Sequence, residues 1–126
     1  MILPEQRGYR KLIVYQKAKE LLLLTYKITK SFPKVELYVL LPQMRRAALS
    51  IPANIVEGYT KHSRRDFARF LDISLGSAGE LGLFLEISLD LGYINTNEFK
   101  KADALLTEVK KLLYSFRRSL KGDPKS

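Results

Sequence analysis

Four polar side chains recur at helical spacing in the segment 43–58, QMRRAALSIPANIVEG, and they are the first candidates for chemistry. On a helical wheel they fall within about 80° of one another, opposite an apolar side. They are Arg46, Ser50, Asn54 and Glu57. A stripe of this kind can bind a small polar ligand, or it can form a hydrogen-bonded network with another helix or subunit. We favour the network, because spacing alone is weak evidence for a ligand site.

The same segment places Pro52 in a helix interior. An uncompensated proline there costs about 3 kcal/mol, because it removes one backbone donor and crowds the preceding turn. We expect a kink at Pro52, with Ser50 and Asn54 hydrogen-bonding the carbonyl groups that the kink frees.

A cluster of cations follows in the segment 61–70, KHSRRDFARF. Cations at a helix N-terminus oppose the helix dipole by a few tenths of a kcal/mol each, so helix stability does not explain them. A phosphate-binding surface explains these cations, and the alternative explanation is a solvated basic turn. The predicted nucleic-acid contacts are Lys61, Arg64, Arg65 and Arg69, with Arg45 and Arg46 added from the preceding segment. Tyr59 and Phe67 could stack on bases, although the apolar seam that contains Phe67 favours a core position for it.

Residue types that most enzymes and metal sites use are scarce. The chain has one histidine, His62, and no cysteine, so thiolate sites, cysteine nucleophiles and the usual zinc sites are excluded. Glu86 and Asp90 stand four residues apart, but no Glu-x-x-His partner supports a di-metal site. We expect no catalytic residue, no metal and no cofactor.

Charge favours polyanionic partners. The 126 residues carry 22 Lys and Arg against 13 Asp and Glu, a formal charge of +9. Residues 70–94 nevertheless contain four acids and no Lys or Arg, whereas 7–34 hold eight basic residues and one acid. The acidic stripe on the third predicted helix either contacts a basic stripe of a neighbouring subunit or keeps an oligomer soluble.

These residues must be positioned by helices, because apolar positions repeat every three or four residues between widely spaced prolines. We predict one all-α domain over 1–126, an up-and-down antiparallel four-helix bundle. Its helices span about 9–31, 42–57, 64–91 and 96–120, Ser63 caps the third helix, and 122–126 form a flexible tail.

The third predicted helix carries a second apolar seam that a monomeric bundle would leave exposed. That seam consists of Phe70, Ile73, Phe84, Ile87 and Leu91, and the first helix adds Tyr15, Leu22 and Tyr26. We therefore predict a homo-oligomer; the alternative is that the wide apolar faces serve a thick monomeric core. Gly76, Gly79 and Gly82 lie within the same helix, and we interpret them as sites of tight helix packing. The N-terminal residues lack a signal-peptide core and the longest leucine run is too short to span a membrane, so we expect a cytoplasmic protein without membrane contact.

A longer motif contains most of these residues. It comprises Arg45, Arg46, Ala47, Ser50, Ile51, Pro52, Asn54, Ile55, Glu57 and Gly58, then Gly76, Ser77, Glu80 and Leu81. With the flanking segments it resembles the 23S rRNA intervening sequence proteins over about residues 10–120, departing at Pro42 and Val56. The resemblance implies a four-helix bundle that assembles into a ring, a pentamer, in bacteria, with no established enzymatic activity. A similar bundle, the accessory variability determinant of diversity-generating retroelements, forms a basic pentameric barrel that binds nucleic acid and a reverse transcriptase.

The predicted function is therefore a non-enzymatic oligomeric scaffold that binds nucleic acid through basic surfaces, RNA in preference to DNA. The alternative is a scaffold that recruits another protein and binds no nucleic acid.

Overall fold

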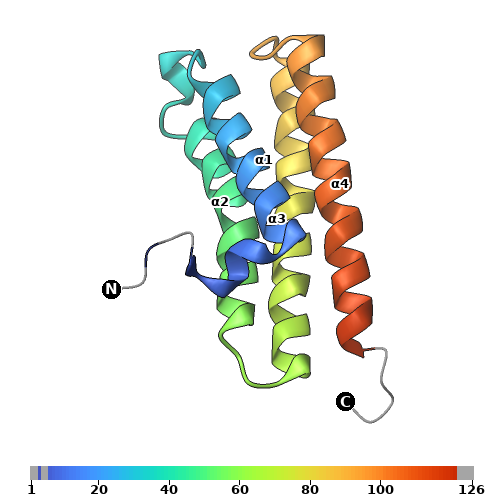
Figure 1. Ribbon diagram of the computed structural model, residues 1–126. Helices are drawn as coiled ribbons and strands as arrows, with labels where there is room; N and C mark the ends of the chain where they lie inside the picture. The colour runs from blue at the N-terminus through green and yellow to red at the C-terminus, as the bar shows by residue number, and fades with distance from the viewer. Residues whose placement is uncertain (1–2, 4–5, 122–126) are drawn as a thin grey trace.

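The described part of the chain, residues 3 and 6–121 of the computed structural model, folds into four α-helices and two short 3-10 turns, without strands. The helices are α1 (Ile13–Thr29), α2 (Leu40–Tyr59), α3 (Arg64–Asp90) and α4 (Thr96–Lys121), and the 3-10 turns are η2 (Gly8–Lys11) and η3 (Lys34–Glu36). Successive helices run in opposite directions, and α4 returns to pack beside α1 (Figure 1). The predicted all-α bundle is confirmed.

The buried side chains follow the predicted three-and-four spacing. On α4 they are Ala102, Leu106, Val109 and Leu113, and on α1 they are Val14, Ala18, Leu21, Thr25, Ile28 and Thr29. Each helix thereby turns one apolar stripe toward a shared core and keeps its charged side chains outside.

The predicted helix over 9–31 is wrong at both ends. Leu12 has an extended backbone (φ −72°, ψ 122°), so Tyr9 belongs to η2, α1 begins at Ile13, and α1 ends at Thr29. The break lets the Tyr9 ring pack against Tyr15, with centroids 4.9 Å apart, which a straight helix would not allow.

Helix α2 begins at Leu40, two residues before the predicted start. Pro42 is consequently its third residue, where the missing N–H would have had no helical partner. The helix continues through Pro52, which is buried. Asn54 Nδ2 donates to the carbonyl of Ser50 at 2.8 Å, whereas the carbonyl that Pro52 leaves without its helical donor is that of Ala48. The kink at Pro52 stays a prediction.

Helices α3 and α4 begin where we predicted. Asp66 N donates to Ser63 Oγ at 3.1 Å, which confirms the predicted cap of α3. At α4, Asn95 N donates to Glu98 Oε1 at 2.9 Å and Glu98 N donates to Asn95 Oδ1 at 2.8 Å. This reciprocal pair satisfies two backbone donors at the helix start. The predicted tail at 122–126 lies outside the described residues.

Candidate functional site

A polar network joins α2 to α3. The hydroxyl oxygens of Ser50 and Ser77 lie 2.7 Å apart, and Asn54 Nδ2 donates to Ser50 Oγ at 3.0 Å. The buried Ser74 hydroxyl donates to the carbonyl of Ile51 at 2.8 Å. The network interpretation is thus confirmed for Ser50 and Asn54, and Ser77 supplies their partner on α3.

Three further polar side chains of the motif point outward. Arg46 and Glu80 are exposed, and within residues 6–121 neither belongs to an ion pair. Glu57 pairs with Lys61, with Oε1 and Nζ 3.2 Å apart. The stripe therefore divides into a structural half and an exposed charged half.

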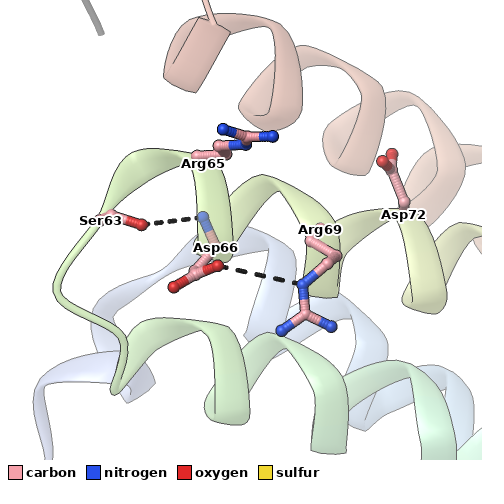
Figure 2. A pocket seen from close by; sticks show the side chains of 5 residues that line it. All are labelled: Ser63, Arg65, Asp66, Arg69 and Asp72. Carbon is pink, nitrogen blue, oxygen red and sulfur yellow. Dashed lines mark hydrogen bonds and ion pairs between the residues drawn. The ribbon is translucent and has the colours of Figure 1, made fainter.

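The turn between α2 and α3 presents the predicted basic cluster. Ser63, Arg65, Asp66, Arg69 and Asp72 line an open pocket of about 580 Å³ (Figure 2). Asp66 Oδ1 lies 4.0 Å from Arg69 Nε, so carboxylates and guanidinium groups alternate along this edge of α3.

Acidic and aromatic neighbours hold some of these cations in place. Lys61 Nζ lies 5.2 Å from the centroid of the Phe70 ring, and the Arg69 guanidinium carbon lies 4.7 Å from the same centroid. Arg64 and Arg65 are exposed, and no carboxylate of the described residues pairs with them. These two side chains are the cations of the turn that remain available to a phosphate.

The fold brings further cations to this turn. Because consecutive helices alternate in direction, the end of α4 and the residues before α1 reach the same end of the bundle (Figure 1). Arg117 pairs with Asp72 across α3 and α4, and Arg118 beside it is exposed. We call this region the basic end: Arg10, Lys11, Lys61, Arg64, Arg65, Arg69, Arg117 and Arg118. Sequence reasoning missed the contribution of η2 and α4, although the helix order contained the signal.

An aromatic chain holds the basic end together. Tyr9 packs on Tyr59 with centroids 6.3 Å apart, Tyr59 on Phe67 at 6.4 Å, and Phe67 on Phe116 at 5.0 Å. Phe67 is partly buried and packs against the core, as its apolar seam predicts. Tyr59 keeps an exposed fraction of 43%, so part of its ring remains open to solvent.

Arg45 and Arg46 lie apart from the basic end. They line a groove of about 520 Å³ near the start of α2, and the fourteen residues from Arg46 to Tyr59 correspond to about 20 Å of helix. The Arg45 guanidinium carbon stands 4.4 Å from the centroid of Tyr26, and Arg45 Nε donates to Thr29 Oγ1 at 3.1 Å. The six predicted nucleic-acid contacts therefore form two separate groups.

The glycines of α3 only partly fit the predicted tight packing. A Cβ at Gly82 would lie 3.3 Å from Leu106 Cδ2, but a Cβ at Gly76 or Gly79 would meet nothing within 4 Å. Within the chain, tight packing is wrong for Gly76 and Gly79, because both occupy the outer surface of α3. A close approach of this kind occurs at Gly58, before the turn, where an added Cβ would lie 2.7 Å from Phe67 Cδ1.

Metal and membrane features are absent from what the structure describes. No group of three or more His, Asp or Glu side chains in these residues could hold a metal ion. No helix among them is both long and apolar enough to cross a bilayer.

Fold and site together define a small helical-bundle protein with one basic end and a separate arginine-lined groove. The model of the 23S rRNA-intervening sequence protein family matches residues 10–115, and the chain belongs to this family. It is also similar to a crystal structure of a protein of unknown function from the S23 ribosomal protein family of Bacteroides thetaiotaomicron VPI-5482. The two share 30% sequence identity, with a TM-score of 0.76 over 84% of this chain and 99% of the other. No curated protein matches the chain.

Proposed function

We propose that this chain is a non-enzymatic, self-associating scaffold of the bacterial cytoplasm that binds nucleic acid through its basic end. One observation carries the proposal: the fold gathers cations from η2, the α2–α3 turn and the end of α4 on one surface. Its carboxylates, Glu57, Asp66 and Asp72, already pair with Lys61, Arg69 and Arg117. Arg64, Arg65 and Arg118 remain for phosphates.

The expected recognition is of the phosphate backbone and is independent of base sequence. Exposed guanidinium groups at this end of the bundle can contact phosphates, but the aromatic rings beside them contact one another. The family description names ribosomal RNA, which favours RNA over DNA as the partner. For the assembly, the family resemblance implies a pentameric ring, which multiplies the charge of each copy.

Electrophoretic mobility shift tests this proposal. An RNA hairpin and a DNA duplex of matching sequence are titrated at salt concentrations from about 50 to 200 mM. Replacing Arg64, Arg65 and Arg118 by Ala should weaken binding of every sequence. The slope of log affinity against log salt should fall by about one for each phosphate that the variant no longer neutralises. The matched control removes Lys27, Lys30 and Lys100, which are exposed at the opposite end.

No retardation of RNA or DNA near 50 mM salt would overturn nucleic-acid binding. Equal weakening in the control and the arginine variant would move the site away from the basic end.

Exposed apolar side chains favour the second candidate, a scaffold that recruits another protein. Tyr38 and Val39, between η3 and α2, have exposed fractions of 87% and 64%. Capture from bacterial lysate with and without nuclease separates the two functions. Loss of all captured molecules after nuclease treatment supports nucleic-acid binding, whereas one stoichiometric protein that survives the treatment supports recruitment.

A further inference from the structure

The second apolar seam predicted for α3 is only partly exposed, because Phe84 and Ile87 pack against the core. The inner seam of the helix, from Leu71 to Ser88, is buried in the core. On the opposite face residues repeat at the same three-and-four spacing as far as the C-cap Leu91, and we call this face the ridge: Ile73, Gly76, Glu80, Leu83, Ile87 and Leu91. Ile73, Leu83 and Leu91 have exposed fractions of 42%, 53% and 53%. Apolar residues at this spacing are typical of a helix that packs against a partner along that face.

Open space at Gly76 fits the same interpretation. A glycine inside a helix costs about 1 kcal/mol relative to alanine, and no contact of this chain accounts for Gly76, since an added Cβ would meet nothing within 4 Å. The ridge is therefore lowered at Gly76, between Ile73 and Glu80.

A complementary concave surface lies elsewhere on the same chain. The groove of about 520 Å³ runs between the end of α1, the loop after η3 and the start of α2. It is lined by Tyr26, Leu37, Leu41, Pro42, Arg45, Arg46 and Leu49. Leu37 and Leu49 have exposed fractions of 47% and 51%, so the walls of the groove are apolar and solvent-accessible.

Charge distinguishes the two surfaces. The ridge holds Glu80, and the same helix adds Glu86 and Asp90, while residues 70–94 contain no Lys or Arg. The groove holds two arginines and no carboxylate. Arg45 is fixed in place by Tyr26 and Thr29, so little of its side-chain entropy remains to be lost on binding.

We infer that the ridge of one copy docks in the groove of a second copy of this chain, with Glu80 opposite Arg46 and Leu83 packed against Leu37 and Leu49. A second copy is the occupant because one chain supplies both halves of an apolar and charge-complementary pair. The two surfaces differ, so a docked pair still presents one free groove on the first copy and one free ridge on the second. Such head-to-tail contacts generate a ring when the rotation closes. The inference rests on the proposed self-association and specifies its interface.

Charge reversal tests the interface in solution. Static light scattering of the full chain should give a mass well above the 14.5 kDa of one copy. Arg46→Glu alone and Glu80→Arg alone each place like charges opposite one another, and each should raise the dissociation constant at least about tenfold. An equimolar mixture of the two variants should regain association, because each contact between the two variants joins opposite charges, although a five-membered ring would keep one contact between like charges. The matched controls, Lys100→Glu and Asp103→Arg on the exposed surface of α4, should stay associated.

Cross-linking keeps the test decisive if a charge variant does not fold. The chain has no cysteine, so Leu49→Cys and Leu83→Cys can be introduced into separate chains and mixed under mild oxidation. A disulfide-linked dimer should form in the mixture and be much weaker in either variant alone, since the contact joins two different surfaces.

The outcomes separate this inference from the proposed function. A wild-type mass of one copy overturns the interface and the self-association while leaving nucleic-acid binding to the mobility-shift test. An oligomeric wild type whose mass is unchanged by both charge reversals, or a mixture that forms no 49–83 disulfide, overturns the interface alone. Loss of association in each variant and its recovery in the mixture supports the ridge and the groove.

Discussion

Ser50 on α2 and Ser77 on α3 share a hydrogen bond, with their hydroxyl oxygens 2.7 Å apart, inside an otherwise largely apolar helix pair. Ser74 adds a second link to α2 through the carbonyl of Ile51. Directional bonds at these positions fix the rotation of both helices about their axes. The faces that point away from the core follow from that rotation, so the network also determines where Arg46 and Glu80 are displayed.

Replacing Ser77 by Ala should lower the free energy of unfolding by about 1 kcal/mol, because it removes the interhelical bond and one partner of Ser50. The double substitution of Ser50 and Ser77 should cost less than the sum of the two single substitutions, since both remove the same bond. Urea denaturation of the four proteins checks this. Strict additivity would show that the two hydroxyl groups are not coupled.

The helices and their buried faces were predictable from sequence, because burial at every third or fourth position is recorded locally. Leu106, Val109 and Leu113 illustrate this. The break at Leu12 was not predictable in this way, because it depends on contacts of Tyr9 with Tyr15 and Tyr59. Tyr59 is fifty residues away from Tyr9 along the chain. Local pattern carries no information about such a contact.

The candidate site likewise contains some residues that were predictable from sequence and others that were not. The cations of the turn were found because they are adjacent in sequence, whereas Arg117 joins them only through the antiparallel packing of α4 on α3. The presence of three glycines in α3 also did not show which neighbour, if any, each glycine would face. Gly82 faces Leu106, while Gly76 and Gly79 face away from the chain.

Two glycine substitutions should act in opposite directions. Gly79→Ala adds a methyl group to open space and should stabilise the chain by about 0.5–1 kcal/mol through helix propensity. Gly58→Ala places a Cβ 2.7 Å from Phe67 Cδ1 and 3.0 Å from Phe70 Cβ, and should destabilise it by about 1–3 kcal/mol. Thermal denaturation at low protein concentration measures both. A loss of stability in Gly79→Ala would require a contact at that face in the folded protein.

Arg45 and Arg46 are neighbours with different roles. Arg45→Ala removes the contact with Tyr26 and the bond to Thr29, and should lower the unfolding free energy by about 1 kcal/mol. Arg46→Ala removes an exposed side chain and should change it by less than about 0.5 kcal/mol. Chemical denaturation of dilute samples compares them. Equal effects of the two substitutions would contradict the anchored position of Arg45.

The hydrogen bond between Tyr93 and Glu36 should make stability depend on pH in the alkaline range. Tyr93 Oη donates to Glu36 Oε2 at 2.7 Å and ties the α3–α4 turn to η3, while the Tyr93 ring packs on Phe32 with centroids 5.2 Å apart. Donation to the Glu36 carboxylate, with a smaller contribution from burial, raises the pKa of Tyr93 above its ordinary value of 10.0.

The folded chain therefore holds this phenolic proton more tightly than the unfolded chain does. The resulting stability is fully present below pH 10 and is lost as the pH rises through the raised pKa of Tyr93. Tyr93→Phe lacks the hydroxyl group, so its melting temperature should lie below that of the wild type by a constant amount near neutral pH, and the gap should narrow above about pH 10. Tyr114→Phe, at a tyrosine with an exposed fraction of 56%, is the control and should follow the wild type throughout. A gap for Tyr93→Phe that stays constant into strongly alkaline solution would show that the phenolic proton bonded to Glu36 does not account for the difference.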